Sequence, residues 1–208
     1  EDNMLSFYNE QGEIISKKIP LKTKLRPHGN MNPSFTKYKN SLMYRDEYKD
    51  TIYQISNKGV ISPRLFVDYG EERRNNKENF LRTYSKYADG DEYDEKPSST
   101  NYLYYESDNY WLLKIIEYGI PANKYGIIRR FALKNKTLGQ VSFVDFDKED
   151  TMFNCAIPFL EDKKLYFLVQ ARRITQIPEW MRPYFVNLSV LDNVKEEDND
   201  FVFIFNLK

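Results

Sequence analysis

Hydrophobic and polar positions alternate in short runs along most of this chain, which is typical of β-strands with one buried face. Between residues 41 and 70 the pattern predicts three successive strands, at residues 42–44, 51–55 and 65–67. A tight turn is expected before the third strand, because Gly59 can take a positive φ at no steric cost. A meander of this size cannot bury both of its faces, so it must stack on further units.

The chain repeats this unit. Gly12 and Gly59 occupy the same position in similar turns, 47 residues apart. Residues 143–146 (Phe-Val-Asp-Phe) match residues 66–69 (Phe-Val-Asp-Tyr) at a spacing of 77 residues, which includes the 29 residues of a polar insert, 71–99. Without the insert this second spacing is 48 residues, close to the 47 residues that separate the two turn glycines. A period of about 40–50 residues built from four strands is the mark of a propeller blade, so the sequence predicts an all-β propeller or part of one.

The strand count predicts about three and a half blades of four strands. Two strands are expected within residues 4–20, four in each middle unit, and three near the C-terminus, at residues 152–159, 165–171 and 201–205. We expect this last strand to be buried, because an open apolar edge promotes association. Within the insert, the helical spacing of apolar residues predicts a helix over residues 75–88, packed on the outside or the top of the blades. Residues 1–208 are thus expected to form a single propeller domain or the C-terminal portion of one.

Composition narrows the classes of function. Lysine plus arginine and aspartate plus glutamate each number 31, so the net charge is zero and no overall field favours nucleic acid. A single cysteine, Cys155, excludes an internal disulfide and a multi-cysteine metal site, and we expect an inert buried thiol there. No run reaches the roughly 18 apolar residues of a membrane span, and no signal-peptide pattern is present. Because the sequence starts at Glu1, we expect a processed chain, a trimmed chain or a fragment.

The central stretch resembles a known family. Tyr44, residues 50–55 (DTIYQI) and residues 67–70 (VDYG) form a pattern similar to a blade of the bacterial six-bladed β-propeller lipoproteins of Bacteroides-type organisms. Residues 197–208 resemble the C-terminus of these proteins, although Asp200 stands where proline is usual. The resemblance implies the C-terminal half of an exported protein at the periplasm or cell surface, which is commonly lipid-anchored. Its motifs are specific for the fold and carry no known chemistry.

The sequence predicts no catalytic residue, metal site or cofactor. His28 is the only histidine and has no nucleophile motif near it, so it is expected to be an ordinary surface imidazole. Residues 89–95 look like a calcium loop, but Tyr93 occupies a ligand position and the pattern fails. Asp68 and Asp145 hold matching repeat positions, which a structural role at strand ends explains better than a glycosidase pair.

Two arginine pairs and two aromatic residues are the candidates for binding. They are Arg129, Arg130, Arg172, Arg173, Tyr104 and Trp111. In an alternating strand one member of each arginine pair faces each side, and arginines near a propeller mouth could hold carboxylate or phosphate groups. Salt bridging to the many acidic residues is the competing explanation. The two aromatic residues could stack on sugars or peptides, although core packing explains them equally well.

Together these features favour a non-enzymatic binding or interaction module outside the cytoplasm, with no cofactor. Its partner is expected to be a small molecule, a glycan or a protein, and the full-length protein is expected to be lipid-anchored rather than membrane-spanning. The alternative is a hydrolase or lyase with its site at the mouth of the propeller channel. An enzyme should gather titratable groups with perturbed pKa values in one cleft, whereas a binding module should present aromatic and arginine side chains without such a cluster.

Overall fold

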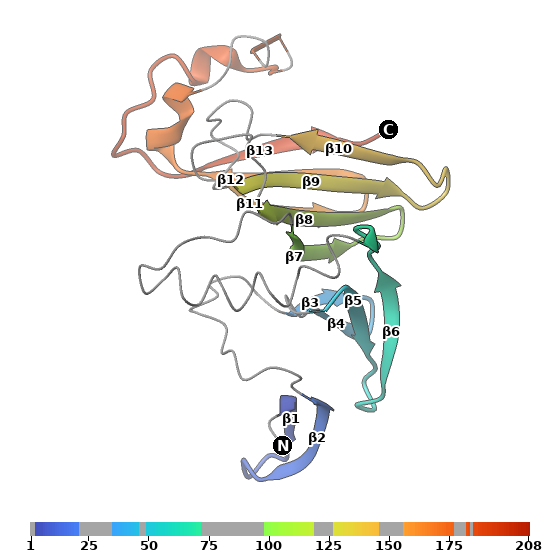
Figure 1. The fold of residues 1–208 in the computed structure, drawn as a ribbon. Coiled ribbons are helices and arrows are strands. Elements are labelled where there is room, and N and C mark those ends of the chain that lie inside the picture. Colours follow the sequence, from blue (N-terminus) through green and yellow to red (C-terminus); the bar gives the residue numbers. More distant parts are fainter. Residues whose placement is uncertain are drawn as a thin grey trace, which may run out of the picture.

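Antiparallel strands make up most of the regular structure in the part of the chain that is described. The computed structural model describes residues 3–20, 35–45, 49–71, 98–118, 127–145, 156–176, 182–183 and 185–208. These residues form four separate sheets that follow one another in chain order (Figure 1). The all-β fold expected from the alternating sequence is thereby confirmed.

The first sheet is a hairpin of β1 (Asn3–Tyr8) and β2 (Ile14–Pro20). The β3–β6 sheet holds β3 (Phe35–Tyr38), β4 (Ser41–Arg45), β5 (Thr51–Ile55) and β6 (Ile61–Phe66). The β7–β10 sheet holds β7 (Ser98–Glu106), β8 (Tyr110–Tyr118), β9 (Ile127–Asn135) and β10 (Val141–Asp145). The β11–β13 sheet holds β11 (Ile157–Glu161), β12 (Lys164–Val169) and β13 (Phe201–Asn206).

Each sheet is a simple meander, and the sheets meet through their first strands. In the two larger sheets each strand pairs with the next along the chain. Strand β7 contacts both β3 and β11, so the first strands of three successive sheets lie together while the last strands lie apart. Strands arranged radially around a common axis, with the first strand innermost, are the blades of a β-propeller. The sheets are therefore three successive blades, and the hairpin precedes them.

Equivalent turns confirm the repeat. The amide of Gly12 donates to the carbonyl of Asn9 at 3.0 Å, and the amide of Gly59 donates to the carbonyl of Ser56 at 2.9 Å. Both glycines have positive φ, 81° and 72°, and Gly139 in the β9–β10 turn follows with 69°. The side-chain oxygens of Asn9 and Ser56 also accept amide hydrogen bonds from within their own turns. The hairpin thus supplies the third and fourth strands of a blade, as β5 and β6 do in the next.

The second predicted equivalence is also confirmed. Phe66 lies on β6 and Phe143 on β10, which are the fourth strands of their sheets. Both rings are more than half exposed, at 56% and 62%. The fourth strand of two blades therefore presents an exposed aromatic side chain, seven residues after the turn glycine Gly59 in one and four residues after Gly139 in the other.

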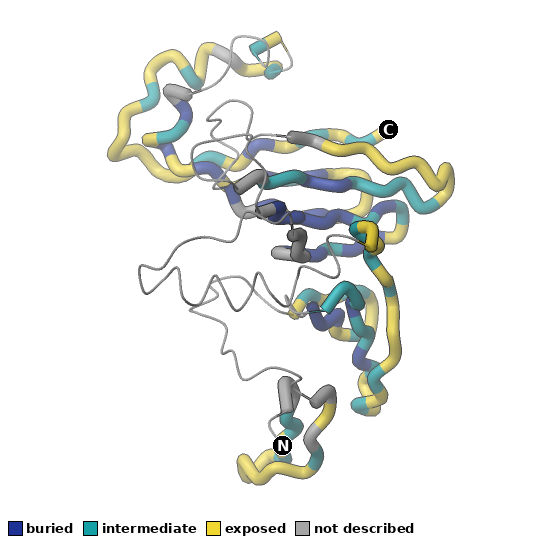
Figure 2. The backbone as a smooth tube through the Cα atoms, viewed as in Figure 1, coloured by how far each residue is buried: buried dark blue, intermediate teal, exposed yellow. Residues whose placement is uncertain are grey.

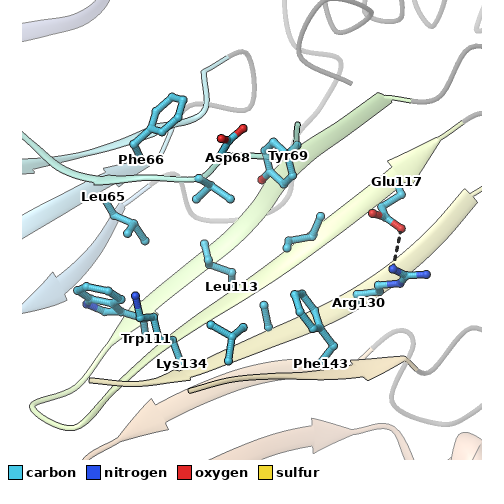
Figure 3. Close-up of a pocket in the computed structure, with 14 residues that line it drawn as sticks. Leu65, Phe66, Asp68, Tyr69, Trp111, Leu113, Glu117, Arg130, Lys134 and Phe143 are labelled. Atoms are coloured by element: carbon cyan, nitrogen blue, oxygen red, sulfur yellow. Dashed lines mark ion pairs between the residues drawn. The ribbon is translucent and has the colours of Figure 1, made fainter. Parts of the chain in front are cut away.

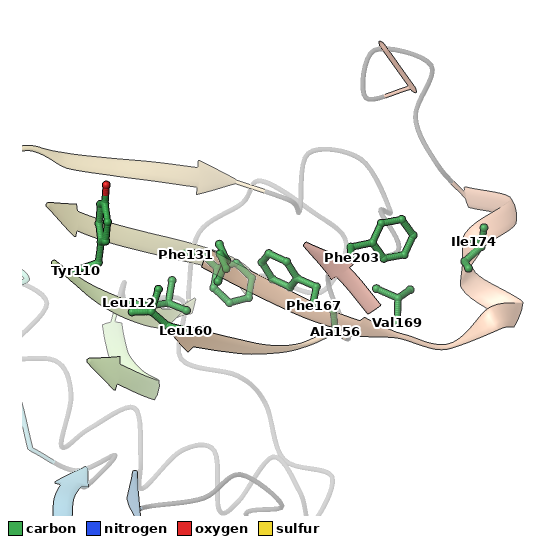
Figure 4. Close-up of a cluster of buried hydrophobic side chains, with 10 residues drawn as sticks. Tyr110, Leu112, Phe131, Ala156, Leu160, Phe167, Val169, Ile174 and Phe203 are labelled. Carbon is green, nitrogen blue, oxygen red and sulfur yellow. The ribbon is translucent and has the colours of Figure 1, made fainter. Parts of the chain in front are cut away.

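Many residues of β7, β8 and β9, the strands in the middle of the stack, are buried (Figure 2). Their apolar side chains pack between neighbouring sheets. Between the β3–β6 and β7–β10 sheets lie Met43, Ile52, Tyr104, Leu113, Ile115 and Ala132. Between the β7–β10 and β11–β13 sheets, the rings of Phe131 and Phe167 meet edge to face with centroids 5.4 Å apart (Figure 4). Alternation along each strand sends one set of side chains to each neighbouring sheet.

Two expectations about segment ends are corrected. β7 begins at Ser98, inside the predicted 71–99 insert, because Ser98 and Ser99 pair with the far end of β8. Residues 72–97, with the predicted helix, lie outside the described residues. β12 ends at Val169, and residue 171 begins a 3₁₀ helix, η1 (Ala171–Gln176), rather than ending a strand.

The expectation that the last strand is buried is wrong for one of its faces. β13 pairs with β12 within its own sheet. Phe203 is 7% exposed, but Val202 and Ile204 are 58% and 56% exposed. Strand alternation places these two side chains on the side of the sheet that turns away from the β7–β10 sheet, where none of the described residues covers them.

Candidate functional site

A groove of about 380 Å³ runs between the β3–β6 and β7–β10 sheets (Figure 3). One wall is the end of β6 and the residues that follow it, up to Tyr69. The other wall is the face of β8, β9 and β10 that points toward them. The register places Trp111, Lys134 and Val141 in one row across this wall. A second row holds Leu113, Ala132 and Phe143.

The groove is the outer continuation of the core between the two sheets. Leu113 and Ala132, near the middle of the sheet, are buried against the β3–β6 sheet. On β10, at the outer edge, Val141 is 48% exposed and Phe143 is 62% exposed. Twisted sheets diverge toward the rim of a propeller. The apolar face of the β7–β10 sheet is therefore covered by the β3–β6 sheet at its inner strands and left exposed at its outer strand.

Charged groups lie at both ends of this apolar groove. Arg130 Nη1 lies 3.3 Å from Glu117 Oε2, so these two charges neutralise each other at one end (Figure 3). At the other end Lys134 Nζ lies 5.1 Å from the centroid of the Trp111 ring, within cation–π range. No carboxylate among the described residues forms an ion pair with Lys134. The groove therefore offers an aromatic and aliphatic surface with one available cation.

A second cluster, the Glu106 clamp, ties the same two sheets together. It consists of Glu106, Arg64, Lys136 and Tyr104. Arg64 reaches Glu106 with two hydrogen bonds, Nη2 to Oε1 at 2.5 Å and Nε to Oε2 at 3.2 Å. Lys136 Nζ donates to Oε1 at 2.6 Å, and the Tyr104 hydroxyl donates to Oε2 at 2.5 Å. The carboxylate has no solvent exposure and is held by four charge-assisted hydrogen bonds.

The clamp fixes the protonation states of its members. Burial alone would raise the pKa of Glu106, but the hydrogen bonds from Arg64, Lys136 and Tyr104 outweigh it and lower that pKa to about 2. Burial, followed by the hydrogen bond to Glu106, raises the pKa of the Tyr104 phenol. The hydrogen bond to Glu106 likewise raises the pKa of Arg64. A carboxylate that stays ionised and fully bonded at neutral pH is a poor general acid or base. We therefore interpret the clamp as a structural link between the two sheets.

Turns at one end of the sheets extend this network. Lys136 Nζ lies 4.6 Å from the Tyr38 ring centroid, and the Tyr38 hydroxyl donates to Asp108 at 2.9 Å. The Asn109 side-chain amide donates to the carboxylate of Asp162 at 2.6 Å. Hydrogen bonds thus link the β3–β4 turn to the β7–β8 turn, and the β7–β8 turn to the β11–β12 turn. These links fix the three sheets relative to one another at this end.

The structure brings two of the six predicted binding residues into the groove. Trp111 and Arg130 line it. Tyr104 is buried in the core and belongs to the clamp through its hydroxyl. Arg129 precedes Arg130 on β9 and therefore points to the opposite face of the sheet, as the alternation predicts.

The second arginine pair belongs to another part of the fold. Arg172 and Arg173 lie in η1 rather than in a strand. Arg172 is exposed, and its Nη2 donates to Gln170 Oε1 at 2.9 Å. Neither Arg172 nor Arg173 lines the groove that Arg130 lines.

Sequence reasoning missed Phe143 and Lys134 as groove residues and Glu106 as the centre of the clamp. The repeat did mark Phe143 as equivalent to Phe66, and its position on an outer strand was the available signal. Glu106 follows Tyr104 by two residues on an otherwise apolar strand face, which predicts a buried carboxylate. Its partners lie 42 and 30 residues away along the chain, so only the fold could identify them.

Several expectations fall outside the described residues, among them His28, Cys155 and the residues 89–95 loop. Among the residues that are described, no three His, Cys, Asp or Glu side chains gather as a metal-binding group. None of the described helices is both long and apolar enough to cross a membrane.

Comparisons with known proteins agree with this architecture. The model of a family described as a 6-bladed beta-propeller matches residues 1–110. A protein of Bacteroides fragilis NCTC 9343, described as a candidate exported protein, has a crystal structure similar to this chain, with a TM-score of 0.61 at 14% identity. The similarity covers 98% of this chain and 57% of the Bacteroides protein, so the chain spans little more than half of that protein's length. No curated protein matches the sequence.

Proposed function

The chain belongs to the six-bladed β-propeller family, and from that premise we propose that it is part of a non-enzymatic binding module that acts outside the cytoplasm. The single observation that carries the proposal is the groove between the β3–β6 and β7–β10 sheets. It exposes Phe143 and Val141 beside a lysine that no described carboxylate neutralises. Apolar surface and a few placed polar groups are what ligand sites in proteins share.

The chemistry of the walls defines the ligand class. The flat surfaces of Trp111 and Phe143 suit an aromatic or aliphatic body, which gains free energy by leaving water. Lys134 suits an acidic group at one end of that body, because the ammonium is the available cation in the groove. Arg130 contributes less, since Glu117 already neutralises it. We therefore propose an apolar ligand that carries a carboxylate or similar anion, as a free small molecule or as part of a protein or glycan.

The enzymatic alternative, a hydrolase or lyase, has less to support it. Two carboxylates in the described part of the chain have a lowered pKa, Glu106 and Asp108, and neither lines the groove: Glu106 is buried and fully bonded, and Asp108 is held by Lys39 and Tyr38. The low pKa of Glu106 keeps it ionised, which suits a structural charge and not proton transfer near neutral pH. The alternative stays a prediction without a reactive group assigned to it.

An exported location is part of the same proposal. The family resemblance implies export and lipid anchoring, and the similar Bacteroides fragilis protein is described as a candidate exported protein. We propose the periplasm or the cell surface as the site of action, with a lipid anchor on the full-length protein. Fractionation of cells that produce the full-length protein, with globomycin to block lipoprotein processing, tests both statements.

Two fluorescent probes test the groove. 1-Anilinonaphthalene-8-sulfonate has an apolar aromatic body and a sulfonate, and N-phenyl-1-naphthylamine has a closely similar body without the charge. We expect the sulfonate to bind more tightly than the neutral probe, by about three- to tenfold, because Lys134 meets the anion. Lys134→Gln should abolish that difference, while Phe143→Ala should weaken both probes by about the same factor.

The matched control is Lys164→Gln, which removes an exposed lysine on β12, away from the groove. This variant should leave both affinities unchanged. Equal affinity of the two probes, or loss of their difference in the control variant as well, would overturn the assignment of Lys134. Unchanged binding of both probes to Phe143→Ala would overturn the groove itself.

A further inference from the structure

The outer strands of the two four-stranded sheets differ in how their edges are protected. β6 contains Pro63, which has no amide hydrogen to donate, and its pairing with β5 is irregular opposite that residue. A proline and a bulge are common devices that keep an edge strand from pairing with another chain. β10 has neither, since its pairing with β9 is regular and residues 141–144 (Val-Ser-Phe-Val) include no proline and no charge. Of the two outer strands, β10 is the one suited to receive a further strand.

The backbone of β10 presents its open groups at two residues that line the groove. The amide of Asn135 donates to the carbonyl of Gln140 at 2.9 Å, so this pair is hydrogen-bonded. Antiparallel strands alternate between hydrogen-bonded and non-hydrogen-bonded pairs. Lys134 and Val141 therefore form a non-hydrogen-bonded pair, and the backbone groups of Val141 and Phe143 point away from β9. Among the described strands, none pairs with β10 on that outer side.

The same two residues also turn their side chains to the groove. Val141 and Phe143 line it and are 48% and 62% exposed. Residues directly opposite each other on antiparallel strands place their side chains on the same face. A strand paired with β10 would therefore place the side chains opposite Val141 and Phe143 over the groove. Such a strand covers the exposed apolar surface and bonds the open backbone groups at the same time, which a compact small molecule cannot do.

Charge selects the residue opposite Val141. Lys134 is the neighbour of Val141 on β9, and adjacent strands lie about 4.8 Å apart, so a residue opposite Val141 lies about 10 Å from β9. The flexible stem of Lys134 and a glutamate side chain together span that distance. Asp68, on the facing wall, lies beside Tyr69 rather than Lys134, and its carboxylate accepts a hydrogen bond from the Gly70 amide at 2.9 Å (Figure 3). An acidic residue therefore suits the position opposite Val141.

We propose that β10 and the groove bind an extended polypeptide segment, which joins the β7–β10 sheet as a further antiparallel strand. The segment carries an acidic residue opposite Val141 and, two positions earlier in its own chain, an apolar residue opposite Phe143. Main-chain hydrogen bonds supply the affinity, and these two side chains supply the selectivity. Strand addition at β10 depends on the proposed function of the groove and narrows its ligand class to a peptide.

Capped synthetic peptides test the strand pairing by isothermal titration calorimetry. The probe is Thr-Val-Thr-Leu-Thr-Glu-Thr, in which leucine and glutamate stand two positions apart. N-methylation of the leucine and the glutamate removes the amides that face β10 and should weaken binding at least about tenfold. N-methylation of the threonines that follow them is the matched control, because those amides face away from β10, and should change the affinity less than about twofold. Equal affinity of the two methylated peptides would overturn strand addition.

The acidic position is tested by combining two peptides with two protein variants. Glutamine in place of the peptide's glutamate should weaken binding to the wild type by about three- to tenfold. Lys134→Gln should bind the two peptides equally, whereas Lys164→Gln should keep the wild-type difference because this lysine lies on β12. A difference that persists in Lys134→Gln would overturn the placement of the acidic residue.

Amide hydrogen exchange locates the bound peptide. The amides of Val141 and Phe143 should exchange rapidly in the free protein and at least about fivefold more slowly at saturation, while the Ser142 amide, which faces β9, should change little. Slow exchange of Val141 and Phe143 without peptide would overturn the proposal, because the edge would then be occupied already. If 1-anilinonaphthalene-8-sulfonate binds the groove and the peptide does not, strand addition alone is overturned. If neither binds, the proposed function of the groove is overturned with it.

Discussion

Replacing Glu106 by glutamine should destabilise the fold through the clamp between two blades. The ordinary pKa of the carboxyl is 4.5 and its folded value is about 2. At 1.36 kcal/mol per pKa unit, ionisation of Glu106 stabilises the fold by about 3 kcal/mol at pH 7. The carboxylate is fully buried, whereas Arg64 and Lys136 are 32% and 17% exposed. Solvent screening of these two cations therefore makes about 3 kcal/mol an upper figure.

The pH dependence follows from the direction of the shift. Because the folded pKa lies below the unfolded one, the stabilisation is complete above about pH 5 and is lost as the pH falls toward 2. The difference in unfolding free energy between the wild type and Glu106→Gln should therefore shrink from about 3 kcal/mol at pH 7 to about 1 kcal/mol at pH 3.

Urea unfolding of both proteins across this pH range measures that difference directly. Glu196→Gln serves as the control, because Glu196 is exposed in a run of acidic residues, and its curve should follow the wild type within about 0.5 kcal/mol. A difference that does not change with pH would refute the reasoning, since it would mean that the glutamine disturbs packing rather than charge.

Four further substitutions test the fold. Gly59→Ala should lower the free energy of unfolding in urea by about 1 kcal/mol, because a φ of 72° strains any residue with a Cβ, and Gly12→Ala should lower it by as much. No effect at either site would refute the equivalence of the turns. Phe131→Ala should cost about 3–5 kcal/mol by opening a cavity beside Phe167, and a cost below 1 kcal/mol would contradict the inter-blade core. Tyr38→Phe removes an exposed hydrogen bond and should lower the free energy of unfolding by less than about 1 kcal/mol. A larger loss would mean that the network of turns governs stability.

The blade repeat was predictable because its signals are local. The turn at Gly59 needs a positive φ, and alternation over residues 51–55 selects a strand, which the structure places at Thr51–Ile55. The repeat of such strands and glycine turns at a nearly constant spacing then predicts the four-stranded blade. Family resemblance added the number of blades in the ring, which the described strands alone do not give.

The candidate site was less predictable because it depends on distant pairs. Trp111 and Lys134 meet only through the β8–β9 register, and Phe143 joins them only through the β9–β10 register. The clamp likewise joins residues 30 and 42 positions apart. Predicting that the last strand is buried failed for Val202 because burial depends on a neighbouring blade and not on the strand's own composition.

The most direct test of the binding proposal is to locate the bound probe on the protein. In a ¹H–¹⁵N spectrum of the 208-residue chain, 1-anilinonaphthalene-8-sulfonate should shift the amide signals of Ala132, Lys134 and Phe143, together with the indole signal of Trp111. The Val202→Lys, Ile204→Lys double variant should show the same shifts, because its altered face lies on another sheet. Shifts confined to the β11–β13 sheet and absent from that variant would contradict the account, since the exposed face with Val202 and Ile204, and not the groove, would then hold the ligand.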